Sequence, residues 1–184
     1  MSCNSLTLEE QEAQNLINQN LNLPKTFSIE IGQFSFSESH ASQYYSALLD
    51  QGFLYKTDDN PYTFASEIEV NKEKSAPYFL GRADFGKFTF KKYDIGFDAI
   101  QSISIDKEEK IARVAFTLKY MNIPPYTEEA EKAKEKRGEY SYINLNKKIS
   151  VKLEFKKFDN GWHLKDNSKT PERLLLKDIL NNRF

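Results

Sequence analysis

The residues of this 184-residue chain that could do chemistry are few and far apart. Glu67 and Glu69 stand two positions apart, which would put both carboxylates on one face of a strand, as in some hydrolases. His40 and His163 each lack a second potential ligand at the spacing of a zinc site. We interpret the carboxylates as solvated strand charges and the histidines as structural. The sequence therefore predicts no catalytic residue, no metal site and no cofactor, and favours a non-enzymatic protein.

The single cysteine, Cys3, lies in the opening stretch MSCNSL. One cysteine excludes an internal disulfide, and no basic neighbour would activate the thiol. The stretch SCNS resembles the end of a bacterial lipoprotein processing site, in which the cysteine directly after the cut receives the lipid. The resemblance implies lipid attachment at Cys3 and a periplasm-facing place in the bacterial cell envelope, with a signal peptide removed. An incidental cysteine, a reactive thiol and a cytoplasmic protein are the alternatives.

Basic residues gather in the second half of the chain. Residues 1–80 contain 11 Asp and Glu against 4 Lys and Arg, whereas residues 81–184 contain 16 against 22. If the strands pair as expected, seven basic side chains share the wet face of one sheet: Lys87, Lys91, Arg113, Lys119, Lys148, Lys152 and Lys156. Such a face could attract an acidic protein partner or an anionic membrane surface, whereas the alternative is that these lysines only keep strand exteriors soluble. No aromatic residues alternate with them, which argues against nucleic acid.

The hydrophobic spacing predicts an α+β fold. In the first half we expect a helix over residues 8–20 with a capping box of Thr7 and Glu10, then a strand. A second helix should end at Gly52, before a hairpin that turns at 58–61. From Lys87 the apolar period becomes two, which predicts a twisted antiparallel sheet closed by a hairpin at 159–161.

Two further segments of the second half are predicted to be helical. Residues 124–138 have almost no apolar face, so we expect a marginal, solvated helix capped by Thr127, or a flap. A C-terminal helix should begin with Thr170 and Pro171 and cover the sheet.

The order of elements in residues 8–80, a helix, the stretch GFL and a hairpin, resembles the second half of a winged helix. The resemblance implies DNA binding, but the second helix contains no Lys or Arg, which argues against it. Residues 84–166, with their DNGWHLKD finish, resemble NTF2-like or cystatin-like sheets. That resemblance implies a small-molecule-binding or hydrolytic site in the concave sheet, with a lining of Phe88, Phe90, Phe116 and Tyr120.

These patterns predict a flexible anchor or linker over residues 1–7, an acidic winged-helix-like region over 8–80 and a basic sheet region over 81–184, with one compact domain as the alternative. The leading hypothesis is a non-enzymatic envelope lipoprotein that acts as a protein-interaction module. Its contact surface would be the lysine-rich sheet face or the 124–138 flap. The alternatives are the NTF2-like site and a cytoplasmic winged-helix-like regulator.

Overall fold

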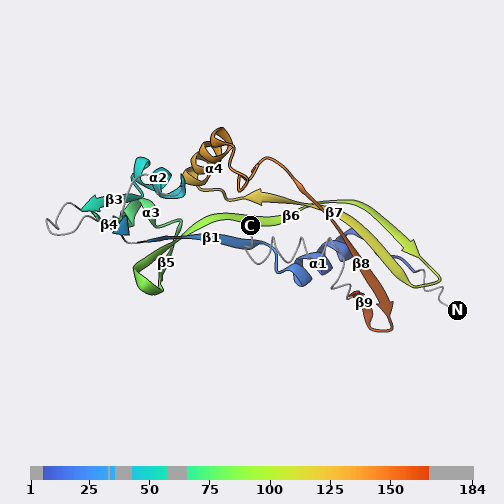
Figure 1. Cartoon of the computed structure of the whole chain (residues 1–184). Helices are drawn as coiled ribbons and strands as arrows, with labels where there is room; N and C mark the ends of the chain where they lie inside the picture. The colour runs from blue at the N-terminus through green and yellow to red at the C-terminus, as the bar shows by residue number, and fades with distance from the viewer. Residues whose placement is uncertain (1–5, 33, 36–42, 58–65, 166–184) are drawn as a thin grey trace. The chain divides into compact units, whose positions relative to one another are not determined.

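The computed structural model describes residues 6–32, 34–35, 43–57 and 66–165 (Figure 1). Over these residues the chain forms four α-helices, a six-stranded, mainly antiparallel sheet and a three-stranded sheet, which confirms the predicted α+β class. Several predicted features lie outside the described residues: Cys3, His40, the 58–61 turn and the helix from Thr170.

The chain divides into two compact units. Unit 1 comprises Met1–Lys25, Ile95–Met121 and Asn146–Phe184, and unit 2 comprises Thr26–Asp94 and Asn122–Leu145. The boundary predicted at residue 80 falls inside unit 2, because strand pairing joins segments that are far apart in the sequence. One long strand, β6 (Lys87–Asp106), has residues in both units.

Unit 1 is built on strands whose hydrogen-bonded order is β6, β7, β8 and β9. β7 (Ile111–Met121), β8 (Ile149–Phe158) and β9 (Gly161–Leu164) pair in antiparallel fashion. The predicted alternation is confirmed, since one face of these strands is buried through Ala112, Val114, Phe116, Leu118, Val151, Leu153 and Phe155. The predicted 159–161 hairpin is confirmed as the turn between β8 and β9.

Helix α1 (Glu10–Leu21) buries Ala13, Ile17 and Leu21. Its N-cap is Glu9, whose side chain forms no capping hydrogen bond with the described residues, and not Thr7, so the predicted capping box of Thr7 and Glu10 is wrong. The helix starts later than the pattern indicated. The Thr7 carbonyl instead accepts a hydrogen bond of 3.1 Å from the indole nitrogen of the buried Trp162 on β9.

Unit 2 pairs β1 (Lys25–Gly32) and β5 (Phe79–Ala83) with the first part of β6. A small sheet has the order β2 (Phe34–Ser35), β4 (Ser66–Val70) and β3 (Leu54–Thr57). The other elements are α2 (Gln43–Asp50), α3 (Lys72–Ser75), the 3₁₀ turn η2 (Asp84–Gly86) and α4 (Pro125–Arg137).

The predicted β3–β4 hairpin is confirmed. Helix α2 ends at Asp50, and Gly52, the predicted left-handed cap, has a φ of +68°. The core of unit 2 is a cluster of large apolar side chains that includes Tyr44, Leu48, Phe53, Ile68, Phe88, Phe90 and Tyr126.

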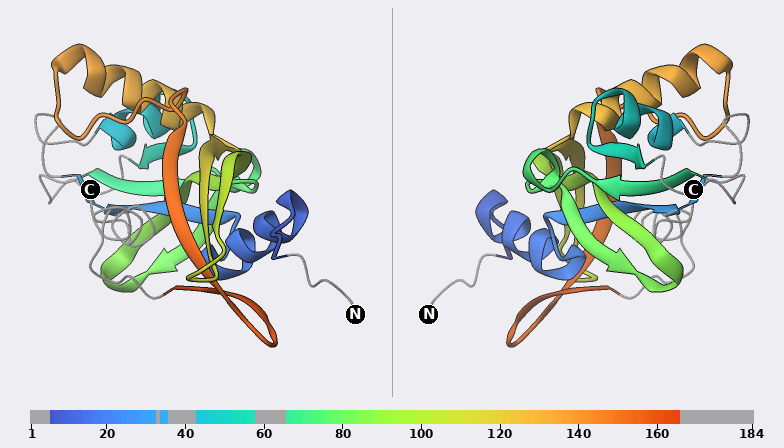
Figure 2. Two further views of the ribbon diagram at one scale, coloured as in Figure 1. Left: turned by 90° about the vertical axis from the view of Figure 1, so that its right-hand side faces the viewer. Right: turned by 90° about the vertical axis from the view of Figure 1, so that its left-hand side faces the viewer.

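Helix α4 corrects the prediction of a solvated helix or flap over 124–138. It packs against α2 (Figure 2) and buries Tyr126, Thr127, Ala130 and Glu131. The helix starts one residue after its N-cap, Pro124, so Thr127 is not the cap; its hydroxyl donates to the Lys92 carbonyl at 2.8 Å. The prediction failed because the buried face of α4 is largely polar and is satisfied by hydrogen bonds to residues distant in sequence.

The buried carboxylate of Glu131 is the centre of this polar contact. Its oxygens accept hydrogen bonds from the Tyr44 hydroxyl at 2.5 Å and from the Ile143 backbone nitrogen at 2.7 Å. The ammonium groups of Lys134 and Lys92 lie 3.3 and 3.7 Å away. Burial, followed by the hydrogen bond to Glu131, raises the pKa of Tyr44, so its hydroxyl stays protonated and donates.

Candidate partner-binding face

The register of β7 and β8 brings basic side chains onto one face of unit 1. Arg113 lies opposite Glu154, and Ala115 lies opposite Lys152. Lys156 lies opposite Ile111 on one side and His163 on the other. Since alternate residues of a strand share a face, Arg113, Lys152 and Lys156 point away from the buried Val114 and Leu153 side.

Two more lysines on this face pair with the same carboxylate. The ammonium groups of Lys148 and Lys119 lie 2.8 and 3.4 Å from the Asp98 carboxylate, and the Thr117 hydroxyl donates to it at 2.9 Å. Hydrogen bonds from Lys148 and Thr117 hold the pKa of Asp98 below its usual value. Asp98 is therefore a fixed negative charge between two lysines.

A further basic residue, which the sequence reasoning missed, is Lys165. Its ammonium group lies 3.1 Å from Glu154, whose other oxygen accepts from Arg113 at 3.0 Å. The alternation of the return strand could have found it, because Lys165 comes two residues after His163. We define the cationic face as Arg113, Lys119, Lys148, Lys152, Lys156 and Lys165.

The cationic face carries more positive than negative charge. Asp98 and Glu154 each lie between two basic side chains, so each neutralises one charge of its pair. A third carboxylate, Asp106, lies 4.0 Å from Arg113. Within the described part of the chain, Lys152 and Lys156 have no carboxylate at ion-pair distance, and both are exposed. The surplus charge is thus concentrated on β8.

Lys87 and Lys91, which were predicted for the same face, belong to unit 2. Lys87 pairs with Glu30 at 2.9 Å. Lys91 is only 17% exposed and lies 2.7 Å from Asp94, a buried carboxylate that also accepts from Thr26 and Asn122 at 2.7 Å each. Of the seven residues predicted to share one face, unit 1 holds five and adds Lys165, whereas Lys87 and Lys91 form ion pairs inside unit 2.

The aromatic residues predicted to line a concave site are mostly core residues. Phe88 and Phe90 belong to the cluster of unit 2, and Phe116 stacks on Phe97 in unit 1 with ring centroids 6.3 Å apart. None of Phe88, Phe90 and Phe116 is more than 1% exposed. These three rings therefore fill cores and do not line an open ligand site.

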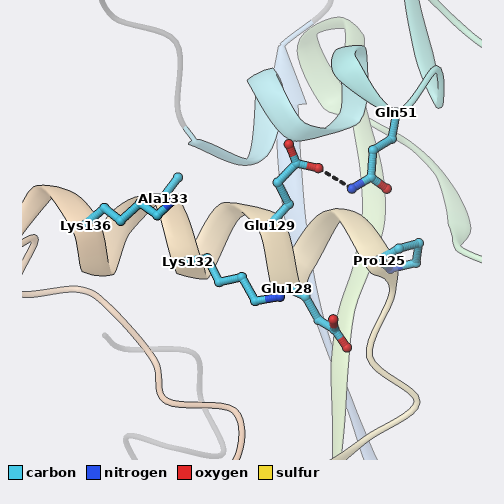
Figure 3. Close-up of a pocket in the computed structure, with 7 residues that line it drawn as sticks. All are labelled: Gln51, Pro125, Glu128, Glu129, Lys132, Ala133 and Lys136. Atoms are coloured by element: carbon cyan, nitrogen blue, oxygen red, sulfur yellow. Dashed lines mark hydrogen bonds between the residues drawn. The ribbon is translucent and has the colours of Figure 1, made fainter.

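A shallow pocket of about 510 Å³ lies on the surface of unit 2, along α4 (Figure 3). Its lining consists of Gln51, Pro125, Glu128, Glu129, Lys132, Ala133 and Lys136. Figure 3 shows Glu129 turned toward Gln51, whose side-chain amide donates to it. The two carboxylates and two amines of the lining balance in charge, and none of the seven residues is a serine, threonine, cysteine or histidine.

The described residues contain no group of three or more His, Cys, Asp or Glu that could hold a metal ion. In the same part of the chain, no helix has the length and apolar character needed to span a bilayer. In comparisons with known proteins, no protein-family model matches the sequence, and neither a curated protein nor a solved structure is significantly similar to the chain.

Proposed function

We propose that this chain is a non-enzymatic binding module that captures an acidic protein on the cationic face of unit 1. The observation that carries the proposal is the surplus of exposed basic side chains on β8, where Lys152 and Lys156 lack carboxylate partners among the described residues. A surface of this kind attracts an acidic partner over a distance of about one Debye length, roughly 8–10 Å at physiological salt.

The carboxylates within the face favour a protein over a polyanion such as DNA. Asp98 and Glu154 stand between the basic side chains and would repel a continuous row of phosphates. A protein surface can offer carboxylates to the lysines and hydrogen-bond donors to Glu154 at the same time. Such mixed polar contacts give specificity and a fast association rate more than raw affinity.

The stretch SCNS supports a second part of the proposal, which is localisation in the cell envelope. We propose that Cys3 carries a lipid in a bacterial envelope lipoprotein and that the anchor holds the module at the membrane. Anchoring would raise the local concentration of the module near an envelope partner, so a modest affinity for that partner would suffice.

Charge reversal tests the binding proposal. The test variant changes Lys148, Lys152 and Lys156 to Glu, and the control changes Lys107, Lys132 and Lys136 to Glu, which alters the net charge equally at other exposed lysines. Calorimetry with an acidic peptide at low salt should show a loss of roughly 10- to 100-fold in affinity for the test variant only, since each exposed pair contributes about 0.2–1 kcal/mol and reversal adds repulsion.

Two results would count against the binding proposal. Equal losses in both variants would mean that net charge alone governs binding. Preferential binding of the wild type to anionic phosphatidylglycerol vesicles or to duplex DNA, with no response to the peptide, would assign the face to a membrane or to nucleic acid.

A further inference from the structure

Among the described residues, half of β8 has a strand on only one side. β7 pairs with β8 from Ile149 to Lys156, whereas β9 pairs only with Phe155 to Phe158. One more hydrogen bond, of 2.8 Å from the Lys165 backbone nitrogen to the Glu154 carbonyl, extends the contact on the β9 side. From Ile149 to Leu153, no described strand pairs with the edge of β8 that faces away from β7.

The register shows which backbone groups point to this open edge. The Lys157 nitrogen donates to the Lys110 carbonyl on the β7 side, whereas the Glu154 carbonyl accepts on the β9 side. The pairing of β7 with β8 has no register shift, so the direction alternates along the strand. The N–H and C=O groups of Ser150 and Lys152 therefore point to the open edge, and no described residue accepts from or donates to them.

We propose that this edge binds an extended acidic segment of the partner as an additional β-strand. The inference rests on the function proposed above and specifies its geometry. Main-chain hydrogen bonds to Ser150 and Lys152 would hold the segment, and its side chains would contact the two faces of the sheet in alternation. On the wet face these side chains would neighbour Lys148, Ser150 and Lys152, so acidic residues at every second position fit best.

The same lysines disfavour the other occupant that an open edge invites, a second copy of this chain. Pairing of two β8 edges would bring Lys152 and Lys148 of one copy close to those of the other on a common face, and lysine on an edge strand opposes such association. An acidic strand turns this repulsion into attraction. The partner class is therefore an extended acidic peptide segment and not the protein itself.

The test uses the full-length protein and an eight-residue peptide that alternates glutamate with valine. Ser150→Pro removes one outward N–H, and because this N–H points away from β7, the existing ladder stays intact. Ser150→Ala is the matched control, since it keeps the N–H. We expect the proline variant to lose about tenfold or more in affinity, with the alanine variant unchanged. The same peptide with N-methylated backbone amides should bind the wild type as weakly.

Amide hydrogen exchange of the wild type gives a second readout that needs no variant to fold. The Ser150 and Lys152 amides should exchange freely in the unbound protein and become protected when the peptide is added. Protection before peptide is added would show that the edge is already occupied and would overturn the inference. Undiminished binding by Ser150→Pro would also overturn it while leaving the proposed function standing, whereas no binding of the peptide by the wild type would remove both.

Discussion

A single substitution at the buried carboxylate of Glu131 should weaken unit 2 by a measurable amount. We consider Glu131→Gln, which keeps the shape of the side chain and removes its charge. Glu131 is 2% exposed, and Lys92 and Lys134 beside it are only 17% and 12% exposed. The substitution leaves two largely buried ammonium groups without their counter-charge. It also places an amide donor where either the Tyr44 hydroxyl or the Ile143 N–H now donates.

The size of the effect follows from these contacts. Removal of one partner from a buried charge pair costs about 3–5 kcal/mol. Both lysines keep some access to water, so the lower end of the range, about 3 kcal/mol, applies. Burial already lowers the pKa of Lys92, against the opposing charge of Glu131, and without that charge the neutral amine would be favoured further. The release of this proton limits the loss, which is a second reason for the lower value.

Hydrogen exchange of α4, read by mass spectrometry, measures this loss where it occurs. A loss of about 3 kcal/mol corresponds to an increase of roughly 100-fold in the exchange rate of the α4 amides. Glu129→Gln on the same helix is the control, because the Glu129 carboxylate accepts from Gln51 at the surface. We expect its effect on α4 exchange to stay below about threefold, in line with surface substitutions in general.

A double variant separates loss of charge balance from simple loss of packing. If the unpaired ammonium of Lys92 causes the instability, Lys92→Met in the Glu131→Gln background should restore a good part of the protection of α4. Exchange of α4 in Glu131→Gln that lies within threefold of the wild type would refute the view that this carboxylate holds the helix in place. A double variant that is less stable than the single one would refute the electrostatic explanation.

Two further predictions concern Asp94 and Cys3. Burial raises the pKa of Asp94, but hydrogen bonds from Lys91, Asn122 and Thr26 outweigh this effect and hold the pKa below its usual value. The Asp94 carboxylate therefore stabilises the fold above its unfolded pKa of about 3.9, and this stabilisation is lost as the pH falls through the folded pKa. Asp94→Asn should thus lower the free energy of unfolding by about 1.5–3 kcal/mol at pH 7. It should also flatten the decrease of that free energy at acid pH, measured by urea denaturation at several pH values, and an unchanged decrease would contradict the prediction. Mass spectrometry of the protein from its own cells should find Cys3 lipidated, and Cys3→Ser should release it from the membrane fraction; an unmodified Cys3 behind an intact Met1 would disprove the anchor.

Local alternation was enough to predict the strands of unit 1. Apolar Val114 and Phe116 alternate with Arg113 and Thr117, and the turn at 159–161 fixes the register of the last hairpin. The outward direction of Lys152 and Lys156 followed from the same period. Such features could be predicted because they depend on residues close together in the sequence.

The features that could not be predicted depend on partners distant in sequence. In the sequence, Thr127 and Glu131 are typical of a solvated helix. In the structure the Thr127 hydroxyl donates to the Lys92 carbonyl, and the Glu131 carboxylate accepts from the Tyr44 hydroxyl. The alternation predicts that Lys91 faces solvent, yet its ammonium group pairs with the buried carboxylate of Asp94. In each case a polar residue is buried because a specific hydrogen bond compensates its desolvation, and a hydrophobic pattern carries no sign of that.

The interleaving of the two units along the chain sets an order for synthesis. All residues of unit 2 have been translated by Leu145, whereas β8 and β9 of unit 1 end at Leu164. At about 5–20 residues per second, the ribosome needs roughly 1–4 s more to add these strands. During that interval the edge of β7 that pairs with β8 has no partner strand, and the core side chains Val151, Leu153 and Phe155 have not yet been made. A nascent chain stalled there should therefore be more prone to aggregation than the complete chain.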